Sequence, residues 1–231
     1  MTARAQRQPL KPQRGWFARL HTWIAVTLGA YIVVLSVSGS AIVFRRDFYR
    51  WHLGSTHPHL MRAVEWLVDL HDNLLARSVG RVLNGVGGML VIVLVVAGLV
   101  VWWPGWRRVA AGLRIGRPEA SRRFALQLHN VLGVVSCALL LIWAVTAVYF
   151  AFPDLFERSI DFFDPDLDDL HRPGEATLLG LIRLHFGRFG GLGIRVLWVL
   201  LGLLPVVLFV TGFVLWWGRV VRPWLRRRAR A

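Results

Sequence analysis

The sequence has 231 residues, of which 55% are hydrophobic, and its mean hydropathy is +0.50, a larger apolar share than ordinary soluble domains carry. The net charge of +15 is consistent with nucleic-acid binding, but the basic residues gather where apolar runs end, which argues against that class. A single cysteine, Cys137, excludes a disulfide framework and a cysteine-based metal site.

Four uncharged stretches follow one another along the chain, and each is long enough to cross a membrane. They cover residues 23–44, 82–103, 131–152 and 196–217. Each has 22 residues, about 33 Å as an α-helix, against a hydrocarbon core of about 30 Å. A bilayer offers no water to backbone groups, so these runs must be helical. We predict an all-α integral membrane protein with a four-transmembrane-helix bundle.

The basic residues predict the orientation of these spans. The segment before the first span carries 5 positive charges, the connection between spans two and three carries 6, and the tail after span four carries 6. These segments share one side of the membrane and hold one acid, Glu119, whereas the other side holds 12 of the 13 acids. The positive-inside rule therefore places both termini in the cytoplasm.

An internal repeat divides the chain. A shift of 114 residues lays Leu70-His71 on Leu184-His185, and Trp102-Trp103 on Trp216-Trp217. A shift of 108 residues lays His21 on His129. We predict two copies of one helical hairpin, whose shared apolar composition explains part of the match. The predicted segments are a tail at 1–14, hairpins at 15–108 and 122–222, a linker at 109–121 and a basic tail at 223–231.

Four histidines fall at repeat-equivalent positions. His21 and His129 precede outward-going spans at the cytoplasmic interface, and His71 and His185 precede inward-going spans on the outer side. A pseudo-twofold axis would make the members of each pair face one another, and two opposed imidazoles are what six-coordinate haem iron requires. The alternative for each histidine is an amphipathic residue that anchors its helix at the interface.

Residues near the histidines are compatible with a macrocycle. Four arginines are candidate partners of haem propionates, although positive-inside anchoring explains each alone: Arg19, Arg81, Arg123 and Arg195. Four glycines would admit a flat ring or simply close helix packing: Gly29, Gly85, Gly88 and Gly202. His71 and His185 lie 11 residues before their spans, and the glycine-rich stretch 187–193 predicts a separate short helix that ends before span four.

These segments resemble a known family. Arg19-Leu20-His21-Thr22-Trp23, the Leu70-His71 segment with Gly98 and Trp102, and Leu128-His129 are similar to the PepSY-associated transmembrane-helix family. The resemblance implies a dihaem protein of the bacterial inner membrane, with His21, His71, His129 and His185 as ligands of two b-type haems. It also implies ferric-siderophore reduction, an activity of some members.

One departure limits that implication. Larger members carry soluble PepSY-type regions in the outer connections, which here are only residues 45–81 and 153–195. The resemblance therefore supports haem and electron transfer better than a siderophore substrate. The outer-loop histidines, His52, His57, His59 and His171, are expected in solvated, acidic loops.

The resulting hypothesis is a bis-histidine dihaem b protein that moves electrons to an outer acceptor such as ferric iron or its chelate. No dinucleotide or flavin motif is present, so the donor would be quinol or a separate reductase. No catalytic side chain and no nucleic-acid partner are assigned. One rival hypothesis is a haem-free membrane anchor or interaction subunit. Another is a small transporter, which the absence of charged residues within the spans disfavours.

Overall fold

The computed structural model describes residues 12–52, 58–116, 121–163 and 173–230, and all regular structure within them is helical. The α-helices are α1 (Pro12–Ala41), α2 (Arg45–His52), α3 (Pro58–Asn73), α4 (Arg77–Trp102), α5 (Val109–Gly112), α6 (Ser121–Ala151), α7 (Pro153–Phe163), α8 (Pro173–His185), α9 (Leu192–Gly202), α10 (Leu204–Trp216) and α11 (Arg222–Arg228). Two short 3₁₀ segments, Ile42–Phe44 and Trp106–Arg108, and a π-helical segment, Trp217–Val221, link some of them.

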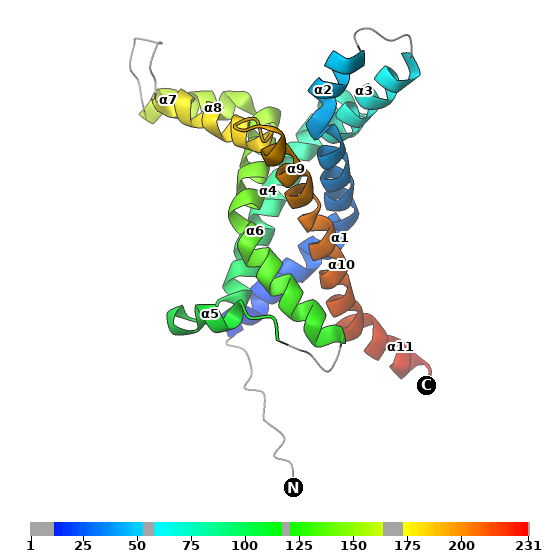
Figure 1. Cartoon of the computed structure of the whole chain (residues 1–231). Helices are drawn as coiled ribbons and strands as arrows, with labels where there is room; N and C mark the ends of the chain where they lie inside the picture. The colour runs from blue at the N-terminus through cyan, green and yellow to red at the C-terminus, as the bar shows by residue number, and fades with distance from the viewer. Residues whose placement is uncertain (1–11, 53–57, 117–120, 164–172, 231) are drawn as a thin grey trace.

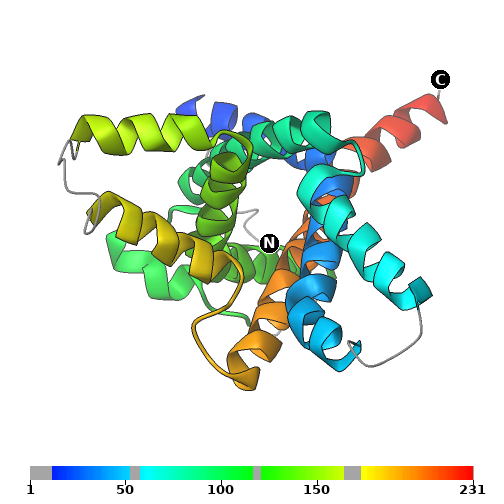
Figure 2. The same cartoon turned by 90° about the horizontal axis from the view of Figure 1, so that it is seen from above.

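Four helical stretches are long and apolar enough to cross a membrane: Gly15–Trp51, Arg77–Trp102, Ser121–Ala151 and Leu192–Arg228. They form a bundle in which α1 and α6 each pack against both α4 and α10 (Figures 1 and 2). The pairs α2–α3 and α7–α8 project from one end, while α5 and α11 lie at the other (Figure 1). The all-helical fold class predicted from the sequence is confirmed, as are the four spans.

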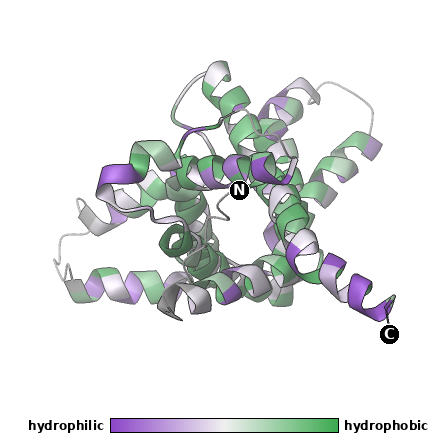
Figure 3. Cartoon of the chain, turned by 90° about the horizontal axis from the view of Figure 1, so that it is seen from below, coloured by the Kyte–Doolittle hydropathy of each residue, from purple (hydrophilic) through white to green (hydrophobic). Residues whose placement is uncertain are grey.

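The outward faces of the bundle suit lipid rather than water. Large apolar side chains on all four spans are well exposed, among them Val37, Val93, Val135 and Leu200. Figure 3 shows apolar residues along the spanning helices and hydrophilic ones gathered on α11. Because lipid tails are as apolar as these side chains, the exposure is what a membrane-embedded bundle requires.

The interior of the bundle is built from small side chains. The buried apolar residues of the described chain are mostly alanine and valine: Ala97, Ala125, Ala144, Val148 and Leu215. Gly29 lies against the ring of Phe209, and Gly88 lies against the backbone of Ala144. Gly85 and Gly202 likewise contact side chains of neighbouring helices. For these four glycines the structure therefore favours the helix-packing alternative over close approach of a macrocycle.

The fourth span is broken where the second is continuous. α9 ends at Gly202 and α10 begins at Leu204, with Pro205 in its first turn. Proline supplies no N–H and disrupts the helical hydrogen bonds of the preceding turn. Two serines of α1 donate hydrogen bonds to backbone carbonyl oxygens near the break. Ser36 donates to the carbonyl oxygen of Gly202, and Ser40 donates to that of Val199 at 3.3 Å. Hydroxyl groups of a neighbouring helix thus provide the hydrogen bonds that these carbonyl oxygens cannot obtain from lipid.

The contact between α4 and α6 generates a testable prediction. A methyl group at Gly88 would lie 2.8 Å from the carbonyl oxygen of Ala144, and a backbone atom cannot move aside cheaply. Gly88→Ala should therefore lower the free energy of unfolding by about 1–3 kcal/mol. Thermal unfolding in detergent, followed by circular dichroism, measures the difference.

The control is Gly180→Ala in α8, where an added methyl group meets nothing within 4 Å. That variant should be neutral or more stable by up to about 1 kcal/mol, since alanine is the better helix former. Equal effects of the two substitutions would contradict the close approach of α4 and α6.

Candidate functional site

Two of the four repeated histidines meet at the end of the bundle that carries α5 and α11. His21 lies in the third turn of α1, and His129 lies in the third turn of α6. We call them the inner pair. Their ring centroids are 6.2 Å apart, and the ring planes are at 85° to one another. Both residues are half-buried, and the two rings lie next to each other although they are 108 positions apart in the sequence.

Nδ1 of each inner histidine is held by a neighbouring span. His21 Nδ1 lies 2.9 Å from the carbonyl oxygen of Leu94 on α4. His129 Nδ1 lies 3.1 Å from the carbonyl oxygen of Leu208 and 3.0 Å from Thr211 Oγ1, both on α10. A carbonyl oxygen only accepts, so Nδ1 carries the proton and Nε2 keeps a free lone pair.

The other two histidines meet at the opposite end of the bundle. His71 lies in the last turn of α3, and His185 is the last residue of α8. We call them the outer pair. Their ring centroids are 6.4 Å apart, and the ring planes are at 64°. α8 is separate from α9, which confirms the predicted interruption of the helix before span four.

Hydroxyl groups hold the outer histidines. His71 Nδ1 lies 3.1 Å from the carbonyl oxygen of Leu35 and 3.2 Å from Ser38 Oγ. His185 Nδ1 lies 2.5 Å from Thr146 Oγ1. Ser38 and Thr146 are 2% and 0% exposed, so both hydroxyl groups are shielded from the surroundings of the bundle.

The direction of these bonds follows from the hydroxyl protons. Ser38 Oγ donates to Val34 O at 2.7 Å, and Thr146 Oγ1 donates to Ile142 O at 2.7 Å. A hydroxyl has one proton, so each oxygen can only accept from the imidazole. The N–H of the outer rings is therefore on Nδ1, as in the inner pair, and Nε2 is again the available nitrogen.

The backbone of each outer histidine is tied to the following span. Asn84 Nδ2 on α4 donates to the carbonyl oxygen of His71 at 2.9 Å. Trp198 Nε1 on α9 donates to the carbonyl oxygen of His185 at 3.3 Å, and Trp143 Nε1 on α6 does so at the same distance. These donors satisfy carbonyls that the ends of α3 and α8 leave open.

Tight turns bring the short outer helices back onto the bundle. Between α3 and α4, Leu74, Leu75 and Arg77 all have positive φ, an uncommon conformation for these residue types. Gly80 packs so closely on this turn that a methyl group there would overlap the carbonyl of Asn73. After α8, Gly187 has a φ of +62° and lies against the indole of Trp198, so both its dihedral angle and its contact require glycine.

Burial keeps the outer histidines uncharged. It lowers the pKa of His71, and it lowers the pKa of His185 to about 3, with smaller contributions from the charges of His71 and Arg188. At neutral pH both rings are neutral imidazoles, which is the protonation state that coordinates a metal.

The geometry of the pairs can be compared with that of two trans ligands on one iron. A metal–imidazole bond is about 2.0–2.1 Å long and the ring centroid is about 1.1 Å further on, so two such ligands place their centroids about 6.2–6.4 Å apart. The measured separations, 6.2 and 6.4 Å, fall in this range. Within the described part of the chain, the hydrogen bonds of these four rings all use Nδ1.

The donor set of each pair can be compared with what haem and a bare metal ion would each need from the protein. Among the described residues, no group of three or more His, Cys, Asp or Glu side chains is placed to hold a metal. Two imidazoles alone would leave such an ion under-coordinated. Haem would supply four nitrogens of its own, and the two imidazoles of a pair would provide the ligands that it needs from the protein. The residues present therefore fit haem.

The four predicted arginines fall into two groups, two that are exposed and two that form ion pairs with aspartates. Arg19 and Arg123 are exposed near the inner pair. Arg81 donates to Asp72 at 2.8 and 3.0 Å, and Arg195 forms an ion pair with Asp47. Their role toward haem propionates stays a prediction. Sequence reasoning missed Ser38 and Thr146, although the 108-residue shift relates these two hydroxyls.

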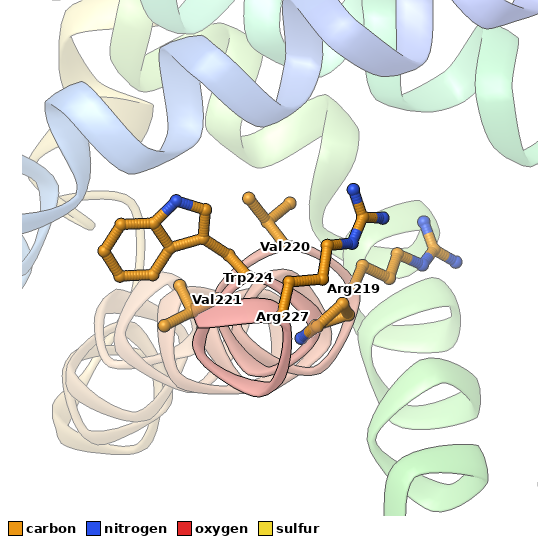
Figure 4. Close-up of a pocket in the computed structure, with 6 residues that line it drawn as sticks. Arg219, Val220, Val221, Trp224 and Arg227 are labelled. Carbon is orange, nitrogen blue, oxygen red and sulfur yellow. The ribbon is translucent and has the colours of Figure 1, made fainter. Parts of the chain in front are cut away.

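The remaining polar candidates lie elsewhere. His57 and His171 are outside the described residues. His59 is exposed and lies 2.9 Å from Arg62, away from both pairs. A shallow hollow at the C-terminal end is lined by one helical segment that includes Arg219, Trp224 and Arg227 (Figure 4). Its mixed basic and aromatic lining suits anionic lipid headgroups.

Comparison with known proteins agrees with the arrangement of these helices. The profile of the PepSY-associated TM region matches residues 52–175 and 161–219. No curated protein and no solved structure matches the chain. The matched region contains His71, His129 and His185 and covers the second and third spans and most of the fourth, whereas His21 and the first span lie before it. The chain is therefore a multi-pass membrane protein that belongs to the PepSY-associated TM region family.

Proposed function

We propose that this protein binds two b-type haems and passes electrons across the bacterial inner membrane. One observation carries the proposal: two pairs of neighbouring imidazoles lie at opposite ends of one bundle, with ring centroids 6.2 and 6.4 Å apart, which is the separation expected if both rings of a pair bound one iron. Haem-free anchoring explains an interfacial histidine, but it does not require four rings with Nδ1 engaged and Nε2 available. Haem bound at these positions supplies one-electron redox chemistry.

Each residue of the two sites has a distinct task. Nε2 of His21 and His129 would bind the inner haem, and Nε2 of His71 and His185 the outer one. The hydrogen bonds at Nδ1 orient the rings and increase the basicity of the ligands. Thr146 and Ser38 do this from fully buried positions, which also exclude water from the Nδ1 side of the outer rings.

The spacing of the two pairs suits transfer across a bilayer. His21 and Ser38, which contacts His71, are 17 residues apart in α1, about 25 Å along the helix axis. The hydrocarbon core is about 30 Å thick. The two sites would thus lie near opposite interfaces, and each electron would cross the core in shorter steps than a single site allows.

The contacts support two repeated hairpins. The carbonyls that hold the inner histidines belong to Leu94 and Leu208, which the 114-residue shift relates. The same shift relates Asn84 to Trp198, the two donors to the outer histidine carbonyls. We propose a pseudo-twofold axis along the membrane normal, with both termini in the cytoplasm as the basic residues indicate.

The electron acceptor on the outer side would be ferric iron or a ferric chelate, which takes up one electron to become ferrous. The donor would be quinol or a separate reductase. The outer connections are short helices rather than a large soluble region, so a small or partner-delivered acceptor suits this chain better than one that needs its own binding domain.

Removing one axial ligand tests the haem assignment. His129→Ala should lower bound haem from two per chain to about one, because a single imidazole binds haem far more weakly than two. His185→Ala should do the same at the other end. Haem per chain and the reduced-minus-oxidised spectrum measure the loss.

His59→Ala is the control, because His59 is exposed and contacts only Arg62 among the described residues. It should keep both haems. Wild-type protein that is folded and expressed with ample haem, yet contains none, would overturn the proposed function.

The hydroxyl of Thr146 provides a second test. Thr146→Val keeps the shape of the side chain but leaves the Nδ1 proton of His185 without its acceptor. We expect about 10- to 100-fold weaker haem binding at the outer site and a shifted midpoint potential. Thr146→Ser restores the oxygen and should restore both values.

Thr27→Val is the matched control, since the Thr27 hydroxyl bonds only to carbonyls of its own helix. Haem titration and redox potentiometry of the three variants check the prediction. A potential and an affinity that Thr146→Val leaves unchanged would show that the hydroxyl has no role in ligand positioning.

A further inference from the structure

Arginine side chains converge beside the outer pair. The guanidinium carbon of Arg188, in the turn after α8, lies 4.2 Å from the centre of the Phe186 ring. That of Arg45, at the start of α2, lies 5.6 Å from the same centre. Segments that are more than 140 residues apart in the sequence thus bring two guanidinium groups to one aromatic ring.

This ring connects the arginines to the outer histidines. The centroids of Phe186 and His185 are 5.2 Å apart. Phe186 directly follows His185 in the chain, and the guanidinium groups of Arg45 and Arg188 both lie over its ring. The cationic groups therefore lie at the edge of the outer site and not on a remote surface.

The charges of this cluster are not compensated by acids in the described chain. Arg188 is half-buried, and its pKa is lowered by burial and by the neighbouring charges of Arg46 and Arg45. Within residues 12–52, 58–116, 121–163 and 173–230, no carboxylate forms an ion pair with any of the three. Like charges held together in this way raise the energy of the fold unless an anion joins them.

Two other arginines at this end of the bundle, Arg81 and Arg195, differ from the cluster because each has a carboxylate partner. Arg81 is paired with Asp72, and Arg195 with Asp47, so a carboxylate already compensates the charge of each. Guanidinium groups bind carboxylates in bidentate fashion, and partial burial strengthens such bonds. The cluster is thus better suited to bind an added anion than Arg81 or Arg195, whose charges already have carboxylate partners.

We propose that Arg45, Arg46 and Arg188 form an anion site that binds carboxylate groups beside the outer histidine pair. Arg45 and Arg188, which both lie over the Phe186 ring, hold the carboxylate, and the exposed Arg46 adds a third positive charge. The carboxylates belong either to a propionate of the outer haem, in which case the site rests on the proposed function, or to a soluble chelating anion that approaches from the outer side.

The propionate source is tested by comparing haem b with its dimethyl ester, in which both carboxylates are blocked. Protein prepared without haem is titrated with each compound, as wild type, Arg188→Gln and Arg45→Gln. If the cluster holds a propionate, each substitution should weaken binding of haem b to the outer site about 10-fold and leave binding of the ester unchanged.

The soluble source is tested with iron-free citrate as the probe. Citrate binding is measured by calorimetry on haem-loaded and on haem-free protein. If the cluster receives a soluble anion, Arg188→Gln should weaken citrate binding about 10-fold without changing the affinity for haem b. Arg188→Lys keeps the charge but not the planar fork, and it should retain part of the affinity.

Arg183→Gln is the matched control, because it removes one exposed positive charge five residues from Arg188. It should change neither affinity. If Arg188→Gln and Arg45→Gln behave like Arg183→Gln with both probes, the anion site is wrong. A protein that binds no haem would overturn the proposed function alone, because citrate binding to haem-free protein still tests the cluster.

Discussion

The arrangement of the bundle depends on the hydrogen bond made by Nδ1 of each of four imidazoles. A polar ring inside an apolar bundle must find a partner there, and each ring finds it on a helix other than its own. Leu94 and Leu208 provide backbone carbonyls at one end, and Ser38 and Thr146 provide hydroxyls at the other. These bonds tie each ring to a neighbouring helix and fix its tautomer, with the proton on Nδ1 and the lone pair on Nε2.

A backbone carbonyl can accept such a bond only because helices at these points pack closely. Gly98 lies against the ring of His21, and Gly212 lies against the ring of His129. At the other end, Gly39 lies against the ring of His71. A larger side chain at any of these positions would push the imidazole away from its acceptor. The small residues thus have two roles: some let helices approach each other, and these let a ring approach a helix.

Much of this fold could be predicted from the sequence. Hydropathy gave the four spans, because the constraint that the bilayer sets on helix length is strong and local. The fixed shifts of 108 and 114 residues also singled out His21, His71, His129 and His185. The break at Leu203 was missed, because an apolar run containing Pro205 still looks like one span by hydropathy.

The partners of the histidines could not be predicted in the same way. Leu94 and Leu208 act through backbone atoms, which carry no signature in the sequence. Ser38 and Thr146 are ordinary small residues until the rotation of each helix is known. Asn84 and Trp198 have the same task at equivalent positions, but an amide and an indole do not look alike in an alignment of the two halves. Contacts between helices decide these roles.

The two pairs differ in what holds them, and the difference follows from their place in the chain. His21 and His129 lie on long spans, whose depth and tilt the bilayer itself constrains. His71 and His185 lie at the ends of short helices outside the spans, so lipid constrains them much less. Their position depends instead on local contacts: a hydroxyl or carbonyl at Nδ1, a side-chain donor to the backbone carbonyl, and a tight turn. The position of the outer site therefore depends on the short helices and turns that connect the spans. The position of the inner site depends on the spans themselves.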